Sequence, residues 1–382
     1  MTSESLFTLQ LPAGIQFGRG AAAGAADVIV ARGRQVLLVH GGDAARAAWL
    51  QRGLAHAGAR VTTLACPREP DVTLVEAGVA LGREVAAEVV VGLGGGAVLD
   101  LAKAVAGLVP ASGEVLDYLE VVGRGRALDA QPLPWVALPS TAGTGAEVTA
   151  NAVIGVPAKA RKVSLRDTRL LADIAIVDPA LTDSSPRAVT LASGLDAITQ
   201  VIEPYISGFA NRFTDLLCRD AIPRGLAALP ALMRAESTGA RDEMAWVSLC
   251  GGLALANAKL GAVHGLAGPL GGIAQGAHGA IAGCLLPPVL DANREACDGQ
   301  AAARIAEVDR WITDAFGVAP EQATAALQQW SREQGLPGLG DMAVPRGKLP
   351  AIARAARGSS SMKGNPVALD EATLVGVMER AW

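Results

Sequence analysis

The feature that most constrains the fold is a change of hydrophobic pattern near residue 185. Before it, short apolar runs end at glycines, prolines or small residues and are followed by helical spacing. These runs are "QVLLVH" (35–40), "ARVTTLAC" (59–66), "AEVVVGLGGG" (87–96), "LPWVALPS" (133–140) and "IAIVDPA" (174–180). Such alternation is typical of a parallel sheet with crossover helices, whereas the later segments show only helical spacing. We predict an α/β domain over 1–185 and an all-helical domain over 186–382.

Length, charge and cysteine usage narrow the class of protein. A chain of 382 residues can bury two cores. Its net charge of -4 comes without a long basic run, so we expect no nucleic-acid partner. The start "MTSESLFTLQ" lacks the basic and apolar regions of a signal peptide, and the five cysteines form no CxxC pair. These features predict a cytoplasmic protein with free thiols.

One long uncharged stretch, residues 260–290, tests this expectation. It is long enough on paper to cross a bilayer. Glycines and prolines interrupt it repeatedly, however, and it contains two histidines. We therefore expect buried, broken helices beside a polar site and no membrane span.

The segment "VVVGLGGGAVLDLAKAVAGLV" (89–109) reads as a buried strand, a glycine triplet and a helix. Gly94, Gly95 and Gly96 permit positive φ and leave free N–H groups at a helix N-terminus, where a pyrophosphate binds. A tight turn also needs small residues for steric reasons alone, so both interpretations stay open. Asp100 and Lys103 either pair on the helix surface or reach a ribose or substrate hydroxyl.

A second strand-to-helix junction, "LPSTAGTGAEVT" (138–149), is dense in hydroxyl groups and glycines. Ser140, Thr141 and Thr144 can donate hydrogen bonds to phosphate or ribose oxygens without adding charge. Thr144 with Glu147 also resembles a helix capping box, and the two interpretations are compatible.

A metal site is predicted from two histidines and one acid. In one continuous helix His264 and His278 would lie about 21 Å apart, but Pro269 and the neighbouring glycines predict a bend that can bring them together. Asp196 lies among apolar residues, where an unpaired carboxylate is costly. A divalent metal held by the three side chains would satisfy it. In the alternative, Asp196 caps a helix and the histidines bond to backbone carbonyls.

With these residues assembled, the chain resembles the iron-containing (group III) alcohol dehydrogenase family over nearly its full length. The resemblance rests on "GGGAVLDLAK" (94–103), "PSTAGTGAEVT" (139–149), "KVSLRD" (162–167), "IVDPALT" (176–182), "GLDAITQVIEPYIS" (194–207), "HGLAGPLGGIAQGAHG" (264–279) and the C-terminal "SSSMKGNPVALDEATLVGVMERAW". It implies a Rossmann-like dinucleotide-binding domain followed by a helical metal and substrate domain, together a dehydroquinate synthase-like fold. A metal ion and a nicotinamide are expected in the cleft between the domains.

The resemblance also implies roles for individual residues. We assign the cofactor to Gly41, Gly94, Gly95, Gly96, Ser140, Thr141, Thr144, Asn151, Lys162 and Leu181, catalysis to Asp100, Lys162 and His278, and the metal to Asp196, Gln200, His264 and His278. Gln200 departs from the family, which usually has histidine there. Its neutral carbonyl oxygen faces the same way as Asp196 but is a poorer ligand than imidazole. Gly268 stands where relatives often have a histidine that relays protons.

The reaction expected from the resemblance is hydride transfer between NAD(P) and a small alcohol or carbonyl compound, with iron or zinc as a Lewis acid. The main alternative is a metal-free enzyme similar to maleylacetate reductases that reduces a keto acid. A cyclase resembling dehydroquinate synthase would need clustered basic groups for a substrate phosphate, and few lie near the two histidines. A cofactor-binding protein without turnover is a further alternative.

Cofactor choice and assembly depend on two short stretches. The first strand ends in His40, Gly41, Gly42 and Asp43. An acid there holds the ribose hydroxyl of NAD, whereas the glycines leave room for the 2'-phosphate of NADP, and we expect NADP. The family resemblance also implies a homodimer, which we expect to form through an N-terminal strand, "LFTLQLP" (6–12).

Overall fold

The computed structural model describes residues 6–159 and 161–382, which form two compact units. One unit comprises Leu11–Thr141 and Gly145–Asp183. The other contains residues 6–10, Ala142–Thr144 and Ser184–Trp382, so a short turn inside the α/β half of the sequence groups with the helices. The domain border near residue 185 stays a prediction.

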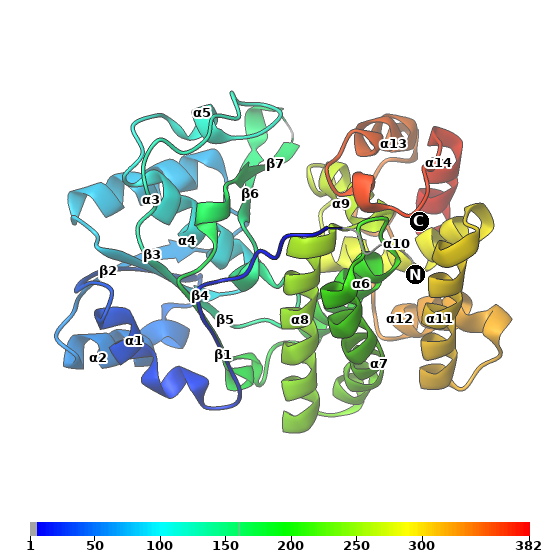
Figure 1. The fold of residues 1–382 in the computed structure, drawn as a ribbon, viewed down its shortest axis with the longest axis horizontal. Helices are drawn as coiled ribbons and strands as arrows, with labels where there is room; N and C mark the ends of the chain where they lie inside the picture. Colours follow the sequence, from blue (N-terminus) through cyan, green and yellow to red (C-terminus); the bar gives the residue numbers. More distant parts are fainter. Residues whose placement is uncertain (1–5, 160) are drawn as a thin grey trace. The chain divides into compact units, whose positions relative to one another are not determined.

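The α/β unit is built on a six-stranded sheet (Figure 1). Its order is β1 (Ile15–Phe17), β8 (Ile174–Val177), β5 (Trp135–Pro139), β4 (Val89–Gly94), β2 (Gln35–Gly41) and β3 (Arg60–Cys66), and every neighbouring pair is parallel. The five apolar runs all form strands, which confirms the predicted parallel sheet. The N-terminal strand predicted over 6–12 is wrong, because these residues form no strand and the first strand in the described part of the chain is β1. The sequence analysis also missed the antiparallel pair β6 (Asn151–Val156) and β7 (Arg161–Arg166), whose residues are partly exposed.

Helices cover both faces of this sheet, as expected for a doubly wound fold. On one face, α1 (Ala25–Val30) and α2 (Ala48–His56) share a buried core with Val36 and Leu38 of β2. On the other lie α3 (Val72–Glu84) and α4 (Gly96–Leu108), where a Cβ at Gly82 would approach Leu37 to 3.5 Å. Because side chains alternate along a strand, neighbouring residues of β2 serve opposite cores. A short helix, α5 (Val115–Tyr118), follows α4.

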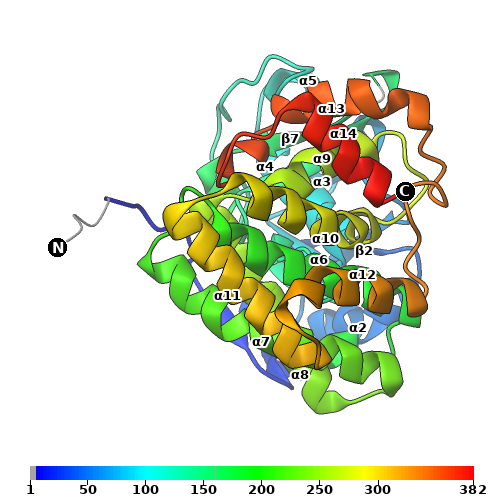
Figure 2. The same cartoon turned by 90° about the vertical axis from the view of Figure 1, so that its right-hand side faces the viewer.

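The second unit is helical, and its described residues from 184 onward contain no strand. Its helices are α6 (Arg187–Ile206), α7 (Arg212–Arg234), α8 (Thr238–Ala258), α9 (Ala262–Gly271), α10 (His278–Ala296), α11 (Gly299–Phe316), α12 (Ala323–Glu333), α13 (Leu349–Arg357) and α14 (Glu371–Arg380) (Figure 2). The predicted combination of an α/β part and an all-helical part is confirmed.

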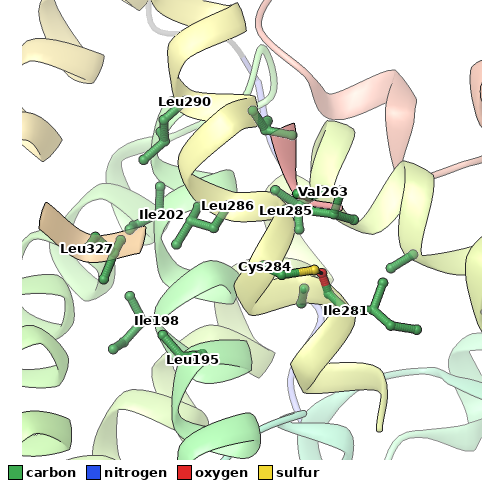
Figure 3. Packing of buried hydrophobic residues seen from close by; sticks show 14 of the residues in the cluster. Leu195, Ile198, Ile202, Val263, Ile281, Cys284, Leu285, Leu286, Leu290 and Leu327 are labelled. Atoms are coloured by element: carbon green, nitrogen blue, oxygen red, sulfur yellow. Dashed lines mark hydrogen bonds between the residues drawn. The ribbon is translucent and has the colours of Figure 1, made fainter. Parts of the chain in front are cut away.

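The core of the helical unit forms where α6 packs against α10 (Figure 3). Leu195, Ile198 and Ile202 of α6 are buried together with Leu286 of α10. A Cβ at Gly283 would lie 2.8 Å from Leu195 Cδ1, so this glycine lets the two helices approach closely. Each fully buried leucine or isoleucine contributes about 1.5–3 kcal/mol. This packing holds α6 and α10, which carry three of the four residues of the predicted metal site, Asp196, Gln200 and His278.

The uncharged stretch forms two helices separated by a turn, as its glycines and prolines predict. Helix α9 ends at Gly271 and α10 begins at His278. No single helix in the described parts of the chain has the length and apolar character needed to cross a membrane. By length and composition alone, α8 and α9 pass that test as a pair, although they are bent by 99°.

Candidate active site

Three of the four predicted metal ligands, Asp196, His264 and His278, meet at one point within the helical unit. Asp196 comes from the middle of α6, His264 from the first turn of α9, and His278 is the first residue of α10. The Nε2 atom of His264 lies 3.4 Å from Asp196 Oδ1, and that of His278 lies 3.9 Å from the same oxygen. One potential ligand atom from each residue lies within 4.8 Å of the other two. The bend between α9 and α10 produces this convergence.

The donor atoms of this cluster fit a cation. Asp196 Oδ1 and His264 Nε2 are buried, and neither has a hydrogen-bond partner within the described residues. Leaving such groups unsatisfied costs about 1–3 kcal/mol each. One carboxylate oxygen and two imidazole nitrogens are ligands that Zn²⁺ and Fe²⁺ accept. The side chain of His278 is 36% exposed, so the cluster is open on that side.

The electrostatics of the cluster also favour a positive charge at its centre. Burial alone would raise the pKa of Asp196, but the imidazoles of His278 and His264 hold it below its ordinary value. Burial would lower the pKa of His264, yet the carboxylates of Glu203 and Asp196 raise it to about 10. The buried acids therefore attract a cation, either a proton on the imidazole or a metal ion in its place.

Glu203 is a site residue that the sequence analysis missed. It is 2% exposed, and its Oε2 accepts from His264 Nδ1 at 2.6 Å. Its Oε1 accepts from the Val263 backbone N–H at 2.7 Å. A carboxylate on Nδ1 fixes the tautomer that leaves Nε2 free to bind a metal. Its position in the sequence could have identified it, because Glu203 follows Asp196 by two helical turns and so lies on the same face of the helix.

We expect replacement of Glu203 by glutamine to weaken metal binding about 10- to 100-fold. The amide oxygen is a poorer acceptor, so the tautomer and basicity of His264 are less well controlled. Chelator competition on the purified variants measures the effect, with exposed Glu295→Gln on α10 as the matched control. An unchanged metal affinity in Glu203→Gln would contradict this role.

Gln200 is buried one turn after Asp196, but its amide has a partner outside the metal cluster. Its Nε2 donates to the Gly143 carbonyl oxygen at 2.8 Å. A carbonyl oxygen only accepts, so this contact also fixes the orientation of the amide. Whether Gln200 also ligates a metal stays a prediction.

At Gly268, on α9, an added Cβ would meet no atom within 4 Å. The position lies one turn after His264 and is half-buried. Gly268 therefore has no side chain that could carry a proton, and the space beside it has room for water.

The glycine triplet forms the predicted junction between a strand and a helix, and its packing supports the steric interpretation. Gly94 ends β4, Gly95 precedes α4 and Gly96 begins it, and none of the three has positive φ. A Cβ at Gly94 would lie 2.5 Å from Val98 Cγ2, and one at Gly95 would lie 3.3 Å from Thr141. The steric interpretation is therefore confirmed for Gly94 and Gly95, and the positive φ that glycine permits is not used here. The residue before α4 is Gly95, which has no side chain to cap the helix, and its carbonyl oxygen accepts from the Val98 and Leu99 N–H groups. Phosphate binding at this helix N-terminus stays a prediction.

The other predicted cofactor residues lie at the ends of elements. Gly41 ends β2, and Ser140 follows β5 and donates its N–H to Gly94 O at 2.9 Å. Thr141 and Thr144 are half-buried; Thr141 precedes the turn Ala142–Thr144, and Thr144 is its last residue. The remaining positions are Asn151 at the start of β6, Lys162 on β7 with Nζ 3.7 Å from Glu69 Oε2, and Leu181 in the 3-10 helix Pro179–Thr182. Their roles stay predictions.

Lys103 is fully buried, which corrects the idea that it pairs with Asp100 on the helix surface. Its Nζ donates to Ala146 O, Thr149 Oγ1 and Asn151 O at 2.9, 3.0 and 2.7 Å. Asp100 lies 4.0 Å from this nitrogen, and its Oδ2 accepts from the Val153 N–H at 3.1 Å. Lys103 therefore ties α4 to residues 146–151, and Asp100 is engaged in the same network.

Glu147 is 2% exposed and belongs to this buried network. The residue before the 3-10 helix Ala146–Val148 is Gly145, whereas a capping box of Thr144 and Glu147 places Thr144 there, so that pairing stays a prediction. Burial raises the pKa of the Glu147 carboxyl from 4.5 to about 7, against the opposing effects of a hydrogen bond to its own backbone and the charge of Lys103.

This raised pKa predicts a pH-dependent stability. The folded state binds the Glu147 proton more tightly than the unfolded state does. The contribution of Glu147 to the unfolding free energy is therefore fully present below pH 4.5 and is lost as the pH rises through about 7. Compared with Glu147→Gln, the wild-type protein should lose about 3 kcal/mol of unfolding free energy between pH 4.5 and 8. Urea unfolding across this range measures it, and parallel pH profiles would show that Glu147 does not titrate there.

Comparison with known proteins identifies the relationship. Residues 12–179 match the sequence profile of iron-containing alcohol dehydrogenases, and residues 190–382 match that of the C-terminal part of the Fe-containing alcohol dehydrogenase family. The chain belongs to the iron-containing alcohol dehydrogenase family. The expected family resemblance is confirmed.

Individual members of this family are similar to this chain in sequence or in structure. Long-chain-alcohol dehydrogenase 1 of Geobacillus thermodenitrificans is 35% identical over 322 residues, which cover 82% of this chain and 80% of that protein. A 1,3-propanediol oxidoreductase has a similar structure, with a TM-score of 0.89, 29% identity and coverage of 99% and 100%. The sulfoacetaldehyde reductase of Bifidobacterium kashiwanohense, solved with NAD⁺, has a TM-score of 0.84, 27% identity and 99% coverage of both chains.

This iron-containing alcohol dehydrogenase family member is a metal-dependent alcohol dehydrogenase or aldehyde reductase, an oxidoreductase that acts on CH–OH groups. The family uses NAD(H) as the hydride carrier together with a metal. The predicted reaction class is confirmed.

Proposed function

We propose that Asp196, His264 and His278 hold a catalytic divalent iron or zinc ion, and that the enzyme interconverts a small alcohol and its aldehyde. The main support for this proposal is a pair of buried polar atoms, Asp196 Oδ1 and His264 Nε2, which lie 3.4 Å apart. Neither has a hydrogen-bond partner among the described residues. A bound ion supplies a Lewis acid that draws electron density from the substrate oxygen.

The residues of the chain have distinct tasks in this mechanism. Asp196 supplies the negative charge that attracts the ion, and Glu203 keeps the His264 proton on Nδ1 so that Nε2 faces the cluster. The partly exposed side of the cluster at His278 admits the substrate. The open space at Gly268 lets water take the hydroxyl proton during alcohol oxidation, because no side chain fills that position.

The nicotinamide dinucleotide is assigned to the α/β unit. Its pyrophosphate is assigned to the N-terminus of α4, with Ser140 and Thr141 of the same unit as donors to its oxygens. Thr144, the last residue of the turn Ala142–Thr144, is a further proposed donor. Lys162 and Leu181 contact the nicotinamide half in this proposal. Asp100 takes part in the proposed reaction only indirectly, through its contact with Lys103. Its carboxylate already accepts a hydrogen bond from the Val153 N–H.

Metal analysis with an activity panel tests the proposal. Protein purified without chelator should contain about one Fe, Zn, Ni or Mn per chain, and should oxidise NAD(P)H with short aldehydes. Chelation should remove both the metal and the activity. Activity that survives chelation would favour a metal-free keto-acid reductase, and binding without turnover would favour a non-catalytic protein.

NADP(H) is the preferred dinucleotide in this proposal. At Gly41, the end of β2, an added Cβ would meet no atom within 4 Å, which leaves space for a 2'-phosphate. The Asp43 carboxylate is already engaged, since it accepts from the Ala45 N–H at 3.0 Å. A comparison of kcat/KM for NADPH and NADH tests this choice, and a preference for NADH would overturn it.

A homodimer is proposed from the edge of the sheet. Strand β1 pairs only with β8 in the described sheet and exposes Ile15 and Phe17. An edge strand offers unpaired backbone groups to a second copy. Light scattering after gel filtration measures the mass, and a monomer at micromolar concentration would contradict the proposal.

The cytoplasm is the proposed location. All five cysteines are free, and four of them are buried, which suits a reducing compartment. Cell fractionation tests this assignment.

A further inference from the structure

The turn Ala142–Thr144 is docked on helix α6 at two places. A Cβ at Gly143 would lie 2.9 Å from Ser193 Cβ, so the backbone of the turn touches the helix. Two helical turns further along, Gln200 Nε2 donates to the Gly143 carbonyl at 2.8 Å. Both contacts come from the face of α6 that also carries Asp196. The turn is held by a helix that supplies a metal ligand.

The position of Gln200 is itself tightly determined. Its side chain is 3% exposed, and a Cβ at Gly251 of α8 would lie only 3.1 Å from Gln200 Cβ. The glycine of α8 therefore leaves the space that the glutamine stem occupies. The Gln200 side chain is therefore packed at its Cβ and hydrogen-bonded at its amide, so few other rotamers are open to it.

We propose that Gln200 is a positioning residue for the dinucleotide, acting through the Gly143 carbonyl on the turn between Thr141 and Thr144. This inference rests on the proposed function, in which these two threonines donate to the cofactor. The hydrogen bond fixes the turn before the cofactor arrives, which lowers the ordering cost of binding. Metal binding is carried by the other three residues and does not require the glutamine.

The substitution Gln200→Glu separates this role from metal ligation. A carboxylate cannot donate to the Gly143 carbonyl, so the tether is lost and replaced by repulsion. A carboxylate is also a stronger metal ligand than an amide. If Gln200 served only as a metal ligand, Gln200→Glu would bind metal as tightly as the wild type or more tightly, and its cofactor affinity would be unchanged. Gln200→Met removes the donor without adding charge, and serves if the buried glutamate prevents folding.

The chain offers a matched control in Gln328→Glu. Gln328 Nε2 also donates to a backbone carbonyl, that of Arg380 at 3.0 Å, but on the exposed surface of α12. The same chemical change is thus made at the same kind of hydrogen bond away from the metal cluster.

The measurements are the dissociation constants of NADH and NADPH by fluorescence, and metal affinity by chelator competition with Zn²⁺. Gln200→Glu and Gln200→Met should weaken dinucleotide binding about tenfold while Zn²⁺ affinity is retained, with Gln328→Glu like wild type. Wild-type dinucleotide affinity in both Gln200 variants overturns the inference, as does a loss confined to Zn²⁺ affinity. If wild-type protein binds neither dinucleotide, the proposed function itself fails, and the inference fails with it.

Discussion

Replacing Asp196 by asparagine should lower kcat/KM about a thousandfold, because the substitution removes the only carboxylate from the cluster of possible metal ligands. The side chain keeps its size, so the packing of α6 against Gly279 of α10 is preserved. The two imidazoles alone provide no negative charge to hold a divalent ion.

Three measurements follow this change: metal content, steady-state kinetics and the stabilisation by added Zn²⁺. Zinc at one hundred times its dissociation constant should stabilise the wild-type protein by about 2.7 kcal/mol, and Asp196→Asn should show no such gain. Asp314→Asn, on the exposed side of α11, is the matched control. Full metal content in Asp196→Asn would remove the carboxylate from the ligand set.

Replacing Lys103 by methionine should lower the unfolding free energy of the α/β unit by about 3–5 kcal/mol. The ammonium group has three oxygen acceptors and lies 4.0 Å from Asp100. Methionine fills the space but leaves those acceptors and the nearby buried carboxyls without their cation. Loss of one partner from a buried charge network is costly for this reason.

Urea unfolding followed by tryptophan fluorescence measures this effect, since the Lys103 Nζ lies 5.6 Å from the centre of the Trp135 ring. Exposed Lys159→Met in the same unit should change stability by less than about 0.5 kcal/mol. Adding Asp100→Asn to Lys103→Met should restore part of the loss. A stability equal to wild type in Lys103→Met would mean that the buried charges are neutralised in another way.

The sheet was predictable where burial on both faces requires continuous apolar runs. Strands β2, β4 and β5 follow "QVLLVH", "VVVGLG" and "WVALP" closely. The strands β6 and β7 were not predicted, because they form no continuous apolar run. Buried positions in them alternate with more exposed ones, and a short 3-10 turn lies between them. A ladder between two such strands depends on register, which a single run of residues does not reveal.

The candidate metal ligands could be chosen from the sequence because acids and imidazoles are rare in apolar segments. The predicted break after Pro269 is also present, since α9 ends at Gly271. Glu203 was missed because its importance depends on His264, which lies 61 residues later in the chain. The glycine triplet was located correctly, but the choice between its two interpretations needed the structure, in which the side chains of Val98 and Thr141 leave little room for a larger residue at Gly94 and Gly95.

The sequence alone determined the fold class, the residue types available to a metal and the places where helices must break, since these follow from local hydrophobicity, backbone freedom and donor chemistry. Only the tertiary structure decided which polar groups are partners. It joined Gln200 to Gly143, Lys103 to residues 146–151 and Glu203 to His264. Such pairings depend on distances between segments remote in sequence, and burial gives each pairing its energetic weight.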